Sequence, residues 1–220
     1  MVDMNLEQAR HNMIVQQIRP WEVMDDQVLD LMTRTPREDF VPPQYRNIAF
    51  TDMEIPLGHG QVMMTPRLEA RMLQALAVQP DESVLEIGTG SGYVTALLAQ
   101  LARHVYSVEI VPDLKQAAEQ RLATRGLTNV TLDEGDAAAG WPRHGSYDVI
   151  AVTGSLPTLP PGLQQQLNVG GRLFAVVGEA PTMVALLISR LGESEWAQEG
   201  LFETVLPPLQ NALPARHFVL

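Results

Sequence analysis

The chain has 220 residues, of which 45% are hydrophobic and 5% aromatic, and its formal net charge is −11. This length predicts one large domain or one domain with an extension. The hydrophobic share is enough to bury a core and excludes an intrinsically disordered chain. The acidic balance argues against nucleic acid and anionic membranes as partners, because binding to phosphates needs clustered Lys and Arg.

Several classes of chemistry lack the residues that they need. The chain has no cysteine, which excludes disulfides, thiolate nucleophiles and cysteine zinc sites and fits a reducing compartment. The histidines show no metal-ligand spacing, so we expect no metal. Residues 1–10 lack the apolar core of a signal peptide, and no run of about 18 apolar residues is present to span a membrane. We therefore expect a cytoplasmic protein with no membrane partner.

The first third of the chain, residues 1–79, is predicted to form a helical extension. Spaced apolar residues predict one helix around 6–18 and a second after the cap candidates Asp25–Asp26. Prolines and glycines recur over 36–66, which excludes long regular elements there. A third helix is expected after Pro66.

Residues 80–220 are predicted to form an α/β domain. Short apolar strands alternate there with helices, which is typical of βαβ units and a mostly parallel sheet. Because such crossovers are right-handed, we expect helices on both faces of a doubly wound sheet. The strands are expected at 84–87, 105–109, 130–132, 147–152 and 171–177, with late strands at 186–188 and near Leu206. The helices are expected at 94–102, 112–125 and around 163–167.

A glycine-rich turn, Gly88-Thr89-Gly90-Ser91-Gly92, joins the first of these strands to a helix. Glycines let the backbone approach a ligand closely, and the N–H groups of the helix point toward it. A dinucleotide site needs a G-x-G-x-x-G spacing, but the bulky Tyr93 occupies the sixth position. A sulfonium nucleoside carries no phosphate and tolerates this ring, and Glu86 before the turn suits a cationic group. A turn without a ligand is the alternative. The candidates for cofactor binding here are Glu86, Gly88, Thr89, Gly90 and Gly92.

Two further acids lie where neighbouring strands are predicted to end. Glu109 ends the strand after the glycine-rich turn, so it lies beside that turn and can accept both hydroxyls of a ribose. Asp136 follows the third strand, where it can accept a hydrogen bond from an adenine amino group. A solvated side chain at Glu109 and an Asx turn at Asp136 are the alternatives. Dehydrogenases also carry a ribose-binding acid at this position, so Glu109 does not distinguish a nicotinamide dinucleotide from a sulfonium nucleoside.

These motifs together resemble the protein-L-isoaspartate O-methyltransferase family of S-adenosylmethionine-dependent enzymes. Val84–Tyr93 is similar to the first motif of such methyltransferases, and Pro36–Pro42 is similar to the family's Pro-Arg-x-x-Phe-Val-Pro segment. Tyr147–Thr153 and Gly170–Gly178 are similar to its fourth and fifth strands, so that the resemblance covers residues 5–210. It implies a Rossmann-like fold, S-adenosyl-L-methionine as cofactor, and methylation of isoaspartyl carboxylates in damaged proteins. The substrate partner is then a peptide or protein.

The substrate loop departs from the pattern of the family. That loop usually reads Gly-Gln-Thr-Ile-Ser-x-Pro, whereas this chain has Gly60-Gln61-Val62-Met63-Met64-Thr65-Pro66. Both hydroxyl-bearing residues are replaced, and Thr65 lies next to the second of them. The resemblance gives Met64 and Thr65 as the catalytic positions. It gives Val62, Met63, Pro66 and Thr153 as substrate-binding positions.

A carboxylate acceptor needs no general base, because its pKa of about 4 leaves it ionised at pH 7. This agrees with the lack of an evident catalytic dyad and leaves positioning and desolvation as the contribution of the enzyme. Three alternatives stay open: a methyltransferase of the same family with a changed acceptor, a non-catalytic S-adenosylmethionine-binding module, and a nicotinamide dehydrogenase. The altered loop supports the first two, while Tyr93 and Glu86 disfavour the third.

Overall fold

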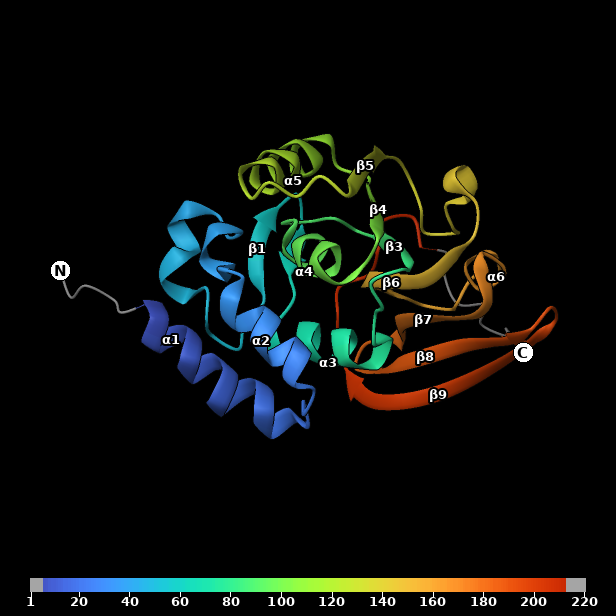
Figure 1. Cartoon of the computed structure of the whole chain (residues 1–220), viewed down its shortest axis with the longest axis horizontal. Coiled ribbons are helices and arrows are strands. Elements are labelled where there is room, and N and C mark those ends of the chain that lie inside the picture. The colour runs from blue at the N-terminus through green and yellow to red at the C-terminus, as the bar shows by residue number, and fades with distance from the viewer. Residues whose placement is uncertain (1–5, 213–220) are drawn as a thin grey trace.

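The computed structural model describes residues 6–212 and is built on a seven-stranded sheet with the order β5-β4-β3-β6-β7-β8-β9. The strands from β5 to β7 run parallel, and β8 and β9 continue the sheet as antiparallel strands. The predicted α/β fold with a mostly parallel sheet is confirmed (Figure 1). The strands are β3 (Ser83–Ile87), β4 (His104–Glu109), β5 (Val130–Glu134), β6 (Tyr147–Leu156), β7 (Leu167–Glu179), β8 (Thr182–Gly192) and β9 (Glu195–Thr204).

The prediction of a strand near Leu206 is wrong. The last strand, β9, ends at Thr204, and the chain then continues without regular structure across the carboxyl ends of the parallel strands. The predicted strand at 186–188 is the middle of the longer β8. A short apolar stretch does not by itself show where a strand ends, because turns and sheet neighbours decide this.

Helices cover the two faces of the sheet unequally. The helices α4 (Tyr93–Leu101) and α5 (Pro112–Thr124) pack on β4 and β5, as expected for right-handed crossovers. On the opposite face, the described residues include the short helix α6 (Pro161–Gln165), the 3-10 helix Pro142–His144 and irregular segments around the partly buried Trp141. Alternate strand residues supply two separate apolar cores, one for each face of the sheet.

The extension adds three α-helices and a small hairpin to the first face. The helix α1 (Leu6–Asn12) runs into a π-helical segment, Met13–Ile18, and together they form the predicted first helix (Figure 1). The carboxylate of Asp25 accepts hydrogen bonds from the N–H groups of Gln27 and Val28, which begins α2. The extension also contains α2 (Asp26–Arg34), β1 (Ile55–Gly58), β2 (Gln61–Met63) and α3 (Pro66–Leu76), together with the 3-10 helices Arg19–Trp21, Arg37–Asp39 and Pro43–Ile48.

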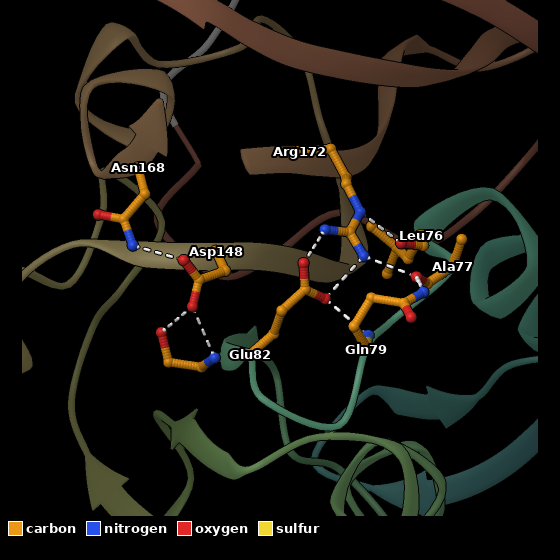
Figure 2. A network of polar contacts seen from close by, with 8 residues as sticks. Leu76, Ala77, Gln79, Glu82, Asp148, Asn168 and Arg172 are labelled. Carbon is orange, nitrogen blue, oxygen red and sulfur yellow. Dashed lines mark hydrogen bonds and ion pairs between the residues drawn. The ribbon is translucent and has the colours of Figure 1, made fainter. Parts of the chain in front are cut away.

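An arginine of the sheet binds the end of the extension to the α/β domain (Figure 2). Arg172 in β7 donates to the carbonyl oxygens of Leu76 and Ala77, at 2.5 and 2.8 Å, where α3 ends. The same guanidinium pairs with the carboxylate of Glu82, which also accepts from the backbone N–H of Gln79 at 2.7 Å. Within residues 6–212, the helical extension and the α/β domain thus share one polar network and one apolar core.

We expect Arg172→Met to lower the free energy of unfolding by about 2 kcal/mol, because it leaves a half-buried carboxylate and two carbonyl groups without their donor. Urea denaturation measures this value. The control is Arg34→Met, since Arg34 is more than half exposed and pairs only with Asp30 at 3.7 Å; it should change stability by less than about 0.5 kcal/mol. Equal effects of the two substitutions would contradict this role.

Candidate functional site

A cleft opens at the carboxyl ends of the central parallel strands, where ligands bind in open α/β sheets. Its floor comes from the glycine-rich turn and from the ends of β4 and β6. One wall is the segment after β5, and the other is formed by β2 and residues 206–210. The predicted cofactor residues Gly88, Gly90, Glu109 and Asp136 all line this cleft.

Glycines shape the turn for two different reasons. Gly88 has a φ of +96°, and a Cβ there would lie 2.5 Å from the Thr153 hydroxyl oxygen, so only glycine fits beside the cleft. Gly92 has a φ of +82°, and its Cβ would lie 3.1 Å from the Cβ of Ala118 in α5. Gly92 therefore serves the packing of two helices and does not line the cleft.

Glu109 is held in place by the backbone of its own site. Its side chain is 4% exposed, and its two carboxylate oxygens accept from the N–H groups of Gly90 at 2.8 Å and Val111 at 3.0 Å. A carboxylate offers about four acceptor positions, so both oxygens keep capacity for a ligand. Two adjacent acceptors in a fixed orientation fit the two hydroxyls of a ribose, and the fit does not depend on a phosphate.

Asp136 forms an Asx turn and also lines the cleft, so both interpretations of this residue from the sequence apply. One carboxylate oxygen accepts from the N–H of Ala138 at 3.0 Å, which is an Asx turn. The other accepts from the side-chain amide of Asn211 at 2.9 Å, and the residue also lines the cleft. The Asx turn thus fixes the carboxylate where it lines the cleft.

Glu86 lies behind the turn, away from the cleft. The side chain is fully buried, and one carboxyl oxygen accepts from the hydroxyls of Thr95 at 2.5 Å and Ser107 at 2.6 Å. Burial raises the pKa of Glu86 to about 8, although the two hydroxyls oppose this shift. Thr89 joins the same group through Ser107, at 2.6 Å between the hydroxyl oxygens. This arrangement supports the turn from below, and Glu86 does not face a ligand in the cleft.

A small hollow continues the cleft beneath the substrate loop. Val62, Gly88, Gly90 and Thr153 line both spaces, while Met63, Met64, Thr89 and Glu69 of α3 line the hollow alone. The Thr153 hydroxyl oxygen lies 2.6 Å from the carbonyl oxygen of Gly88 and 2.8 Å from that of Ile87. The structure thus brings together four of the residues predicted for the substrate site, namely Val62, Met63, Met64 and Thr153.

Thr65 and Pro66 lie elsewhere. Thr65 caps α3 through its carbonyl oxygen, which accepts from the N–H of Leu68 at 3.1 Å. It lines a separate hollow of about 440 Å³, together with Trp21, Arg67 and Phe202. Pro66 is buried in the first turn of α3. The hydroxyl expected to replace the missing ones is therefore on the other side of the loop from the cleft.

The backbone of the substrate loop is fixed by a fully buried arginine. Arg37 donates to the carbonyl oxygens of Met64 at 2.6 Å and Ala49 at 2.8 Å, and it forms an ion pair with Glu69. Its guanidinium carbon lies 5.1 Å from the ring centre of Tyr93. Burial of this ring raises the pKa of the Tyr93 phenol.

Sequence reasoning missed one wall of the cleft. Residues 206–210 form it, and Leu209 lies against the glycine positions 88 and 154. Two backbone hydrogen bonds of 2.9 Å join this segment to Ser155, one from Ser155 to Pro207 and one from Leu209 to Ser155. An irregular segment carries no periodic signal, so only the folded chain shows this contact. Ile110 also lines the cleft. The sequence could have predicted this position, because Ile110 directly follows Glu109.

Strand order, glycine-rich turn and ribose-type carboxylate define a Rossmann-like protein with a site for a nucleoside cofactor. A family model for protein-L-isoaspartate(D-aspartate) O-methyltransferase matches residues 8–212. The protein-L-isoaspartate O-methyltransferase of Synechococcus sp. is 41% identical over 206 residues, which covers 91% of this chain and 84% of that one. That of Myxococcus xanthus is 47% identical over 156 residues, 71% of this chain and 74% of the relative. The chain belongs to the protein-L-isoaspartate(D-aspartate) O-methyltransferase family.

Solved structures agree with this assignment at the level of the fold. A protein-L-isoaspartate O-methyltransferase from Plasmodium falciparum, in complex with S-adenosyl-L-homocysteine, has a TM-score of 0.79 at 21% identity and covers 94% of this chain and 98% of that one. Family membership confirms the resemblance seen in the sequence and the prediction of an S-adenosylmethionine-dependent O-methyltransferase. Within residues 6–212, no helix has the length and apolar character needed to cross a membrane.

We expect Glu109→Ala to weaken the binding of S-adenosylmethionine about 10- to 100-fold, because hydrogen bonds to a charged group contribute about 1.5–3 kcal/mol. Isothermal titration calorimetry measures the dissociation constant. The control is Glu134→Ala, since Glu134 is exposed at the end of the neighbouring strand β5 and does not line the cleft. Unchanged affinity after Glu109→Ala would show that the ribose binds elsewhere.

Methyl transfer is expected to proceed at the same rate after dialysis against EDTA. In the part of the chain that the structure describes, no group of three His, Cys, Asp or Glu side chains could hold a metal ion. The measurement is the initial rate of methyl transfer with and without the chelator. Loss of activity that zinc or magnesium restores would reveal a metal site.

Proposed function

We propose that this chain methylates the carboxylate of an isoaspartyl residue in a polypeptide, at the junction of the cleft with the small hollow. The observation that carries the proposal is the continuity of the two spaces, since Val62, Gly88, Gly90 and Thr153 line both. A ligand held at Glu109 therefore extends toward the substrate loop. The family of the chain supports a carboxyl acceptor.

The chemistry at this junction requires positioning more than proton transfer. Bound S-adenosylmethionine supplies the electrophilic methyl group. A carboxylate with a pKa of about 4 is already ionised at pH 7 and attacks without a general base. What the chain must do is hold that carboxylate in line, about 3–3.5 Å from the methyl carbon, and exclude water. Apolar, buried Met63 and Met64 favour the exclusion of water.

The loop is poorly equipped to orient the acceptor with its side chains. Val62, Met63 and Met64 carry no hydrogen-bond donor, because a thioether is only a weak acceptor. The backbone of the loop is nevertheless fixed by the bond from Arg37 to the Met64 carbonyl. We infer that the acceptor carboxylate is held with one donor fewer than in a loop that carries serine at position 64, and that turnover of isoaspartyl peptides is slow.

This protein offers an apolar surface next to the proposed acceptor site, where the rest of a substrate polypeptide can bind. The 440 Å³ hollow beside Thr65 is lined by three of the exposed large apolar side chains, those of Trp21, Met53 and Val205. The chain passes from Val205 at this hollow directly to Leu206 at the cleft. An extended segment next to the acceptor residue can therefore lie over both.

We expect Met64→Ser to raise the rate of isoaspartyl methylation about 10- to 100-fold, because a hydroxyl donates one hydrogen bond to a charged acceptor, worth about 1.5–3 kcal/mol. The affinity for S-adenosylmethionine should stay within about threefold, since the change does not touch the cleft around Glu109. Initial rates on one isoaspartyl peptide, with calorimetry for the cofactor, measure both quantities.

Thr65→Val is the matched control, because Thr65 lines the other hollow and its side chain makes no capping bond. It should leave the initial rate within about twofold. High activity in the natural chain that Thr65→Val abolishes would instead show that Thr65 orients the acceptor. High activity that neither substitution changes would contradict orientation by a loop hydroxyl.

The proposal itself is tested by transfer of tritiated methyl groups to an isoaspartyl peptide, to its normal aspartyl isomer and to a whole lysate. Label in the isoaspartyl peptide and not in its isomer is the expected result. Label in lysate proteins without label in the isoaspartyl peptide would show a changed acceptor, which the replaced hydroxyls at positions 62 and 64 favour. No label in any of the three would contradict methyl transfer by this chain.

A further inference from the structure

Glu69 in α3 carries a buried carboxylate oxygen without a partner. The side chain is 1% exposed, and its Oε2 is paired with Arg37. Its Oε1 is buried and accepts no hydrogen bond within residues 6–212. Burial raises the pKa of Glu69, while the charge and hydrogen bond of Arg37 lower it. An unsatisfied carboxylate oxygen in a protein interior is costly, so it calls for a hydrogen-bond donor that the described residues do not supply.

The place of Glu69 indicates which molecule this is. Glu69 lines the small hollow together with Thr89 and Ser91 of the glycine-rich turn. The hollow shares Gly88, Gly90 and other walls with the cleft, so the part of a ligand that extends beyond the ribose enters it. In the described chain, no Lys, Arg or His side chain lines this hollow, and Arg37 pairs with Glu69 through Oε2.

We propose that Glu69 binds the α-ammonium group of the methionyl part of S-adenosylmethionine. An ammonium group donates up to three hydrogen bonds, and a carboxylate oxygen without a partner is its natural acceptor. The sequence assigned this attraction for a cationic group to Glu86, but Glu86 lines neither the cleft nor the small hollow, and its Oε2 accepts from Thr95 and Ser107. Glu69, from a different element, takes its place. This inference rests on the cofactor of the proposed function and is independent of its acceptor.

Arg37 makes the assignment specific. It occupies Oε2 of Glu69 and so leaves only Oε1 for a ligand. The same guanidinium binds the Met64 carbonyl, so the ammonium site and the substrate loop are joined through one side chain. Binding of the methionyl group at Glu69 thus acts on the position of the loop that orients the acceptor.

The test compares ligands that differ only beyond the ribose. S-adenosylhomocysteine carries the amino group, an analogue with hydrogen in place of that amino group lacks it, and 5′-methylthioadenosine lacks the whole aminocarboxypropyl chain. Isothermal titration calorimetry gives each dissociation constant without any methyl acceptor. In the natural chain, S-adenosylhomocysteine should bind at least about tenfold more tightly than the deaminated analogue, since a charge-assisted hydrogen bond has this magnitude.

Glu69→Gln should remove this difference. The amide must direct its single oxygen to Arg37, so its NH2 group faces the ammonium. We expect S-adenosylhomocysteine to bind about tenfold more weakly than to the natural chain, with both other ligands within about twofold. Equal weakening of all three ligands would show a structural role and overturn the proposal. Unchanged binding of S-adenosylhomocysteine would overturn it as well.

Glu38→Gln is the matched control. Glu38 is 6% exposed, pairs with Arg10 at 2.5 Å and also has one buried oxygen without a partner, but it lines neither the cleft nor the small hollow. Its substitution should leave all three affinities within about twofold. If Glu69→Gln does not fold, the ligand comparison in the natural chain still decides: no preference for the amino group overturns the proposal. Absence of isoaspartyl methylation with these affinities intact would contradict the acceptor alone.

Discussion

The geometry of the site depends on the buried guanidinium of Arg37. Three chain segments meet there, because it binds Ala49, the Met64 carbonyl and Glu69 of α3 at once. The planar fork of arginine suits such a junction, since its five donors point in fixed directions. Removing one partner from a buried ion pair costs about 3–5 kcal/mol, so the three segments constrain one another. The substrate loop, which contains β2 and leads into α3, is consequently a fixed part of the core.

This constraint explains how the substrate loop can carry side chains that differ from the family's pattern while the rest of the site agrees with it. Arg37 holds the backbone at Met64, so the side chains at positions 62 and 64 can change while the path of the loop stays the same. Glu109, in contrast, is fixed on the sheet by the N–H groups of Gly90 and Val111. Glu109 and the substrate loop are thus held by separate contacts, so the side chains of the loop can change without moving Glu109.

Tyr93 links the glycine-rich turn to the extension that carries the substrate loop. The ring at the sixth position of the glycine-rich turn is fully buried, lies 5.4 Å from the ring of Phe40 and lies beneath the guanidinium of Arg37. The residue that disfavours a dinucleotide spacing is therefore also the contact between the turn and the extension. The large ring of Tyr93 has a structural role, because it fills the space between α4 and the segment after α2.

The sequence by itself determined the parallel strands, the glycine-rich turn, the acid Glu109 and the family, because each depends on a local pattern of residue types. Only the tertiary structure decided which acids line the cleft and the small hollow. Glu86 precedes the turn but points between β4 and α4, whereas Glu69 comes from a helix of the extension. Likewise, Thr65 and Met64 are neighbours in sequence but line different hollows, because the chain turns into α3 between them. The direction of a side chain at the end of an element depends on packing with distant segments, and no local pattern records it.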